Sequence, residues 1–138
     1  MADIDINAEA LELVVRQARQ AVSLAVKYTA TDVWGNIRKE APVDHGRLAG
    51  SFDLSRESDM SYIVGTKVKY ALAVHEGTPP HIIRPVRKKA LFWRGARHPV
   101  KRVMHPGTQG NPYITRAINM TNQRIDKFVR RALREVGM

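Results

Sequence analysis

Apolar residues recur at steps of three and four positions along the first third of the chain. The series is Leu11, Val14, Ala18, Val22, Ala25, Thr29, Val33 and Ile37. Because an α-helix has 3.6 residues per turn, this spacing places all of them on one face and predicts one long helix over residues 7–40. Asn7 is suited to cap the start of this helix, and Pro42 ends it because proline cannot continue the hydrogen-bond ladder.

The apolar surface of this predicted helix is wider than a single stripe. Leu13, Val15, Leu24 and Val26 extend it. Such a helix can be covered on two sides, by its own sheet and by a neighbouring subunit. A well-buried core helix explains the same pattern, so both interpretations stay open.

The middle of the chain, residues 51–104, alternates short apolar runs with turn residues, which predicts strands and shaped loops. Residues 42–48 are predicted to form a turn around Gly46. A first hairpin is expected from residues 51–55 and 62–64, with its turn at Ser58 and Asp59. Residues 68–74 form either a strand or a helical turn, because periodicity does not decide over so short a span. Later strands are expected at residues 82–83, 90–93 and 100–104, and the short connections favour antiparallel pairing.

Residues 111–136 carry a second helical pattern. Asn111 is suited to cap it, Pro112 to occupy its first position and Gly137 to end it. One face is basic and carries Arg116, Arg124, Lys127, Arg130, Arg131 and Arg134. The other is apolar and consists of Ile114, Ala117, Ile118, Thr121, Ile125, Phe128, Val129, Ala132 and Val136. The predicted fold class is α+β in a single domain of residues 1–138: a long N-terminal helix, a small antiparallel β-sheet with long Pro/Gly loops, and a basic C-terminal helix.

Composition adds a strong positive charge to this picture. The formal net charge is +10 at pH 7, which predicts an anionic partner: nucleic acid, an acidic protein surface or a membrane. The chain has no cysteine, so it forms no disulfide and offers no thiol nucleophile. The N-terminus lacks a signal-peptide pattern, and no apolar run has membrane-spanning length. Of the three anionic partners we expect nucleic acid or an acidic protein surface, and no membrane.

Candidate chemistry is sparse. His75, His81, His98 and His105 lie in the central stretch with Glu76 beside one of them, but their spacings match no helix-borne metal-ligand pattern. No G-x-S-x-G motif or glycine-rich phosphate loop occurs. We therefore expect no enzyme activity, no metal and no cofactor. A hydrolase would require His75 or His81 to meet Glu76 in a pocket.

A DNA-binding module is the main alternative function. Basic residues interleave with two aromatic residues in the order Arg84, Arg87, Lys88, Lys89, Phe92, Trp93, Arg94, Arg97, Lys101 and Arg102. A stacking platform beside a positively charged groove has this composition. Basic loops stiffened by proline are equally suited to docking on acidic patches of a neighbouring protein.

Three segments of the chain together resemble one family. Residues 41–51 resemble the pattern A-P-V-D-T-G-x-L-x-x-S, residues 68–78 resemble V-x-Y-A-x-x-V-x-x-G-T, and residues 105–114 resemble H-P-G-T-x-x-x-P-[FY]-[LI]. All three patterns occur, in this order, in the HK97 gp10-like phage protein family. The sequence departs from the family at His45, where threonine is common, and at Gln109 and Gly110, where lysine and proline are usual.

This resemblance implies a tail-completion or neck protein of a long-tailed bacteriophage, located in the virion at the head–tail junction and in the host cytoplasm during assembly. It implies a homo-oligomeric ring, a hexamer or a dodecamer, whose partners are the head-connector and tail-terminator or tail-tube proteins, with non-specific contact to DNA in the channel. No catalytic residues are implied.

Contacts in such a ring are expected on one face of the first helix and on the proline-rich loops. Tyr70, Trp93 and Tyr113 are candidate anchors, placed either in the core or at a subunit boundary. The full set of interface candidates is Tyr70, His75, Glu76, Thr78, His81, Arg84, Arg87, Trp93, Arg97, His105 and Tyr113.

Overall fold

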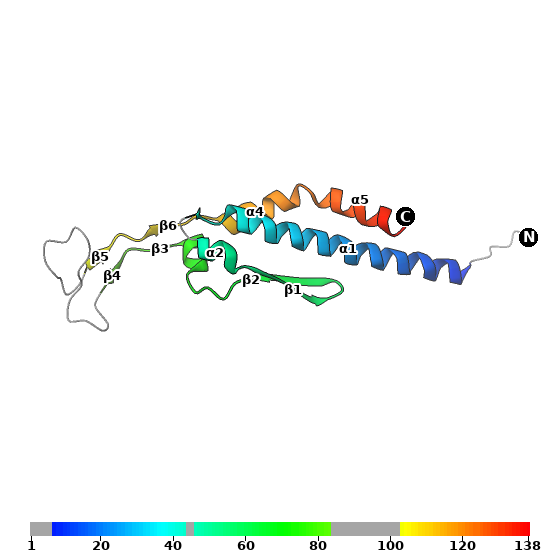
Figure 1. Cartoon of the computed structure of the whole chain (residues 1–138), viewed down its shortest axis with the longest axis horizontal. Helices are drawn as coiled ribbons and strands as arrows, with labels where there is room; N and C mark the ends of the chain where they lie inside the picture. Colours follow the sequence, from blue (N-terminus) through cyan, green and yellow to red (C-terminus); the bar gives the residue numbers. More distant parts are fainter. Residues whose placement is uncertain (1–6, 44–45, 84–102) are drawn as a thin grey trace, which may run out of the picture. The chain divides into compact units, whose positions relative to one another are not determined.

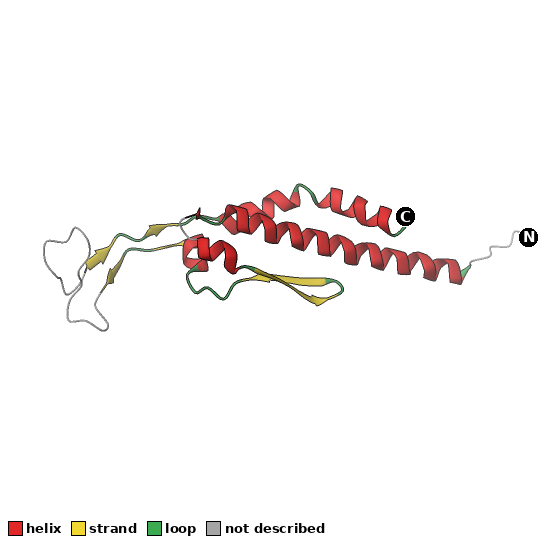
Figure 2. Cartoon of the chain, in the orientation of Figure 1, coloured by secondary structure: helices red, strands yellow, loops and turns green. Residues whose placement is uncertain are grey.

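The computed structural model describes residues 7–43, 46–83 and 103–138. The contacts divide the chain into two compact units. The first unit is Met1–Val68 with Tyr113–Met138, and the second is Lys69–Pro112. Figure 1 follows the chain by residue number and Figure 2 marks its helices and strands. The α+β class is confirmed, with helix as the larger part.

Helix α1 (Ala8–Glu40) runs along the first unit, and it matches the helix predicted from the apolar spacing. The Asn7 side chain caps it by accepting a hydrogen bond from the Ala10 N–H at 3.2 Å, as expected. The Ala41 N–H donates to the Ile37 carbonyl at 2.9 Å, and the helix ends before Pro42.

The predicted turn and first strand are partly wrong, because Gly46–Ser51 forms the short helix α2. Leu48 in this helix is fully buried. The Ser51 hydroxyl donates to the Leu48 carbonyl at 2.6 Å. Burial of Leu48 favours a helical turn here. The sequence did not indicate a helix, because its two glycines disfavour one.

The predicted hairpin follows as β1 (Asp53–Ser58) and β2 (Ser61–Gly65), paired antiparallel in the register Leu54 to Val64. Its tip lies at Asp59 and Met60, which overlaps the predicted turn at Asp59 and shifts it by one residue. Two hydrogen bonds attach this hairpin and the residue before it to α1. The Ser23 hydroxyl donates to the Asp59 carbonyl at 2.8 Å, and the Trp34 indole N–H donates to the Phe52 carbonyl at 2.7 Å.

The predicted C-terminal helix is interrupted, which corrects the expectation of one helix over residues 111–136. The structure has α4 (Tyr113–Asn122) and α5 (Ile125–Glu135). Gly137 ends α5 as predicted, with a φ of 82° and a bond from its N–H to the Arg134 carbonyl at 3.1 Å.

A polar cluster at the interruption joins α4 and α5 to α1. The Thr121 hydroxyl donates to Asp32 Oδ2 at 2.8 Å, and Asn36 Nδ2 donates to Thr121 Oγ1 at 3.0 Å. Arg124 reaches back to Asn36 Oδ1 at 3.1 Å and to Asp32 Oδ2 at 3.0 Å. Asn36 and Thr121 are both buried, so these bonds satisfy groups that would otherwise be costly inside the unit.

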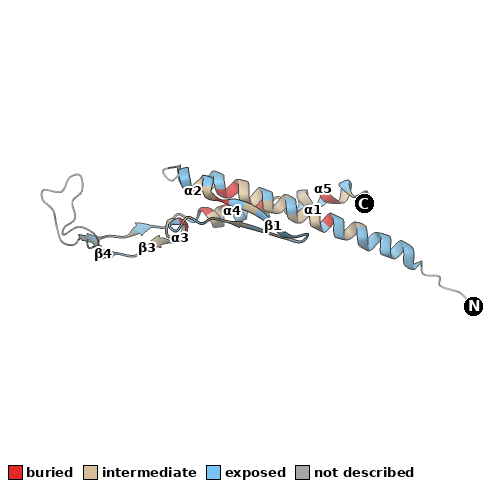
Figure 3. Ribbon diagram, turned by 60° about the horizontal axis from the view of Figure 1, so that its bottom comes forward, coloured by how far each residue is buried: buried red, intermediate tan, exposed pale blue. Residues whose placement is uncertain are grey.

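The apolar core of the first unit is small and lies toward the C-terminal end of α1. Its residues include Ile37, Ala41, Leu48, Phe52, Tyr113 and Ala117. The rings of Phe52 and Tyr113 meet edge to face with centroids 6.1 Å apart. Figure 3 shows the buried positions in red and the exposed N-terminal end of α1 in pale blue.

The second unit consists of α3 (Ala71–Glu76) and two short antiparallel ladders. One ladder pairs β3 (Gly77–Thr78) with β6 (Thr108–Gln109), and the other pairs β4 (His81–Ile83) with β5 (Val103–His105). Helix α3 decides the open choice for residues 68–74 in favour of a helical turn. The strand expected at residues 82–83 is confirmed. The strand expected at residues 100–104 is confirmed over residues 103–104, whereas residues 100–102 and 90–93 lie outside the described part of the chain.

Candidate protein-interaction groove

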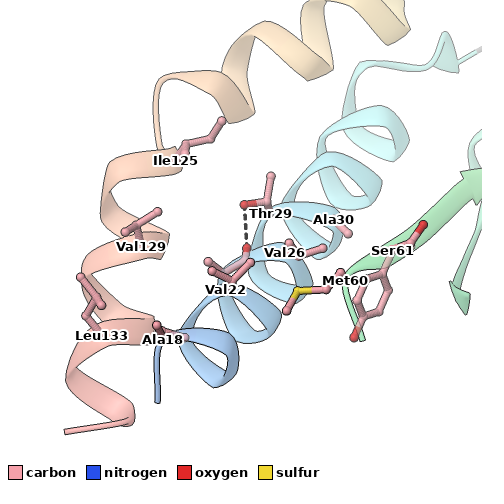
Figure 4. A pocket seen from close by; sticks show the side chains of 13 residues that line it. Ala18, Val22, Val26, Thr29, Ala30, Met60, Ser61, Ile125, Val129 and Leu133 are labelled. Atoms are coloured by element: carbon pink, nitrogen blue, oxygen red, sulfur yellow. Dashed lines mark hydrogen bonds between the residues drawn. The ribbon is translucent and has the colours of Figure 1, made fainter. Parts of the chain in front are cut away.

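An open apolar groove of about 600 Å³ runs along α1 in the first unit. Three elements form it (Figure 4). Helix α1 makes the floor, α5 makes one wall and the hairpin β1–β2 makes the other. The lining residues are Ala18, Ala21, Val22, Ala25, Val26, Thr29, Ala30, Met60, Ser61, Tyr62, Ile125, Val129 and Leu133.

Helical spacing explains why these side chains meet. Val22, Val26 and Thr29 occupy one face of α1 because they are three or four residues apart. On α5, Ile125, Val129 and Leu133 recur every four residues and project toward α1 in Figure 4. The floor is rich in alanine, whose short side chains leave room in the groove for side chains from outside.

The α5 wall is held by a cluster of aromatic and charged residues on the opposite flank of the helix. The Arg131 guanidinium lies 4.3 Å from the centroid of the Tyr28 ring, and its Nε donates to Glu135 Oε1 at 2.9 Å. The Tyr28 hydroxyl donates to the other carboxylate oxygen of Glu135. This hydrogen bond is the main cause that lowers the pKa of Glu135 and raises the pKa of Tyr28.

The chemistry of the groove is that of aliphatic packing. Its hydroxyl groups are few, and the Thr29 hydroxyl already donates to the Ala25 carbonyl at 2.8 Å within α1. Val22 and Met60 remain 50% and 44% exposed. An open, apolar and partly exposed trough of this kind is suited to receive side chains from another helix or loop.

The predicted interface residues divide between the two units. Tyr113 is fully buried in the first unit, and burial raises the pKa of its hydroxyl. This places it in the core, one of the two locations predicted for it. Tyr70, His75, Glu76, Thr78, His81 and His105 belong to the second unit.

Within the second unit, the ladders bring several of the predicted residues into register. His81 pairs with His105, and Thr78 pairs with Thr108, whose N–H donates to Thr78 Oγ1 at 3.1 Å. Tyr70 is 39% exposed at the start of α3, and Glu76 is exposed at its end. Arg84, Arg87, Trp93 and Arg97 lie outside the described residues.

Sequence reasoning missed the groove as a site. It placed Ile125 and Val129 on an apolar helix face and Tyr62 in a strand, but it had no means of showing that these faces meet around α1. Met60 in the hairpin tip was not singled out at all. The pattern of α1 itself, wider than one stripe, was the available signal.

Within residues 7–43, 46–83 and 103–138, no group of three or more His, Asp or Glu residues is placed to hold a metal ion. No helix among the residues that the structure describes is long and apolar enough to cross a membrane. Comparison of the chain with protein-family models, curated proteins and solved structures finds no significant match.

Proposed function

We propose that this chain is a structural protein of a phage virion, a neck or tail-completion protein that joins the head connector to the tail through protein–protein contacts in a ring. The observation that carries a role in protein assembly is the open apolar groove of the first unit. Its partly exposed aliphatic lining is suited to contact with a protein surface. The place in the virion rests on the resemblance of three segments to the phage family.

The arrangement of those segments supports this proposal. Gly77 and Thr78 from one segment pair with Gln109 and Thr108 from another. Gly77 has a φ of 82° and Gly107 a φ of 86°, so both use a backbone conformation that other residues rarely adopt. The residues that carry the resemblance are therefore the ones that shape this part of the second unit.

The proposed function is tested by the assembly state and the partners of the purified chain. We expect native mass spectrometry and electron microscopy to show a closed ring, a hexamer or a dodecamer, either alone or with the products of the adjacent genes. We expect co-purification with a connector or tail-end protein. A chain that forms only open aggregates and binds neither neighbour would contradict the proposal.

A DNA-binding module is the second candidate, favoured by the exposed basic residues Lys127, Arg130 and Arg134 on α5. Arg116 and Arg124, by contrast, pair with Glu40 and Asp32 at 3.0 Å each. A gel-shift series at rising salt separates the two functions, because a DNA-binding protein shows tight binding with a steep loss in salt. A ring component retains DNA weakly at most.

A further inference from the structure

Helix α1 extends beyond the elements that cover it. The C-terminal end of α5 reaches α1 at Gln17, whose side chain donates to the Val136 carbonyl at 3.3 Å. Residues 7–16 are exposed without exception. In Figure 1 this end of α1 projects past the C-terminus of the chain. Leu11, Val14 and Val15 on it are 55%, 49% and 51% exposed.

The uncovered end continues the same apolar seam that forms the groove floor. Leu11, Val15, Ala18, Val22, Ala25 and Thr29 alternate at steps of four and three residues. This is the spacing with which two α-helices pack along a shared seam. One end of the seam is therefore uncovered, and the other end lies at the bottom of a groove.

We propose that the uncovered end of α1 in one copy docks into the groove of a second copy, and that the two helices pair antiparallel about a two-fold axis. Leu11 then lies against Val22 of the second copy, and Val15 lies against Ala18 of the second copy. Each copy supplies one helix end and one groove. The contact is thus made twice, as two-fold symmetry requires.

The dimensions favour this pairing. Residues 8–15 make roughly 12 Å of helix at 1.5 Å per residue, and they lie over residues 18–25 of the other copy, which have the same length. The uncovered end has no wall beside it, so it can enter between α5 and the hairpin. In a parallel pairing the grooves of the two copies would face each other. The α5 helix and hairpin that flank each groove would then collide with those of the other copy.

Charge favours the antiparallel direction as well. Glu12 and Arg19 are exposed on the same flank of the seam, seven residues apart. In the antiparallel register Glu12 lies opposite Arg19 of the second copy, and this contact also occurs twice. No ion pair among the described residues uses Glu12 or Arg19, although Arg19 lines a hollow that also contains Asp59 and Glu135.

This inference goes beyond the proposed function. A ring closes through head-to-tail contacts between unlike surfaces, whereas the α1 contact joins like surfaces. It therefore yields a dimer of free chains, or it holds two rings together. The phage role and the α1 contact can each hold without the other.

Cysteine cross-linking tests the inference on the full chain, which has no cysteine of its own. Two single variants, Val15→Cys and Ala18→Cys, are mixed and oxidised mildly. The proposed register places these two positions opposite each other, within reach of a disulfide. We expect the mixed disulfide to form well in excess of the fraction that random pairing of the two variants would give. Like-with-like disulfides in place of the mixed one would overturn the antiparallel register.

Leu13→Cys is the matched control. Leu13 is 54% exposed on the same stretch of α1, but helical spacing places it on the face opposite the seam. We expect it to cross-link slowly. Cross-linking at Leu13 as fast as in the mixed pair would mean chance collision and would overturn the inference.

A charge exchange provides a second measurement. Glu12→Arg replaces two favourable contacts per pair by two unfavourable ones and is expected to weaken dimerisation by roughly tenfold. Arg19→Glu is expected to weaken it similarly, and the double variant E12R/R19E to restore it. Weakening by each single variant without restoration in the double variant would contradict the predicted contact.

The two proposals fail in different ways in these experiments. Closed rings that bind neck partners but give no mixed disulfide would overturn the α1 pairing and leave the proposed function standing. A mixed disulfide and a discrete dimer, without rings or neck partners, would overturn the proposed function and leave the pairing. Copies that remain monomeric at every concentration, without a mixed disulfide, would overturn the pairing outright.

Discussion

The glycines of the second unit show how single residues shape this protein. A methyl group at Gly77 would lie 2.5 Å from the Thr108 carbonyl oxygen, and one at Gly110 would lie 2.6 Å from the Glu76 carbonyl oxygen. At Gly107 it would collide with the Thr78 carbonyl oxygen. These backbones approach each other so closely that no side chain fits between them. Two of these glycines, Gly77 and Gly107, have the positive φ that tight turns use.

Gly107→Ala is therefore expected to destabilise the second unit by about 1–3 kcal/mol, through steric overlap and through strain at its φ of 86°. Hydrogen exchange of the β3–β6 ladder measures this loss. Gly35→Ala in α1 is the control, because a methyl group there meets nothing within 4 Å. It is expected to stabilise α1 by about 0.5–1 kcal/mol, since alanine favours helix. Equal effects of the two substitutions would contradict this account.

Single residues also show which features of the fold local chemistry predicts and which it does not. The cap at Asn7, the end of α1 before Pro42 and the stop at Gly137 follow from local chemistry, and the structure confirms them. Gly46 was expected in a turn but begins α2. Its conformation depends on burial of Leu48, a tertiary effect that local patterns do not carry.

At the scale of elements, the interruption between α4 and α5 is the clearest case of tertiary control. The stretch contains no proline or glycine. Helical spacing places Thr121 on the apolar face of one continuous helix. In the structure it bonds to Asp32 and Asn36 instead, and Arg124 folds back to the same pair. These partners lie more than eighty residues earlier, so no local window contains the signal.

The link between α1 and α5 is expected to depend on pH through Glu135. Its pKa is lowered from the ordinary value of 4.5, first by the hydrogen bond from Tyr28 and then by that from Arg131. The Glu135 carboxylate therefore binds a proton more tightly in the unfolded chain than in the folded one. Its contribution to stability is present above the ordinary pKa and is lost as the pH falls through the lowered pKa of the folded chain. Unfolding in urea between pH 7 and pH 3 measures it.

Two variants isolate this contribution. Glu135→Gln is expected to be less stable than the parent chain at pH 7, with the difference shrinking toward pH 3. Tyr28→Phe keeps the carboxylate but removes the donor that lowers its pKa most, so it is expected to lose most of the same pH dependence. A difference between parent and Glu135→Gln that stays constant over this range would show that the carboxylate contributes no linked proton.

At the scale of the whole molecule, the order of elements was predictable and the surfaces were not. The long helix, the hairpin and a C-terminal helical region follow from periodicity and turn residues. The groove does not, because its floor comes from α1 and its walls come from residues 60–62 and 125–133. Sequence spacing assigns each of these to an apolar face, yet only the packed unit shows that the faces are left partly uncovered.

The uneven burial along α1 leads to a last prediction, on hydrogen exchange. Asn36 and Ile37 are buried in the core, whereas residues 7–16 are all exposed. A helix end without tertiary contacts frays, so its amides are expected to exchange quickly in dilute solution. When two copies pair through α1, the same amides should become protected, while those of residues 36–37 should keep their rate.

Exchange measured by mass spectrometry at low and high protein concentration separates these regions. The variant E12R pairs more weakly and should require a higher concentration for the same protection. Fast exchange of residues 8–16 at every concentration would show that a second copy does not cover this helix end.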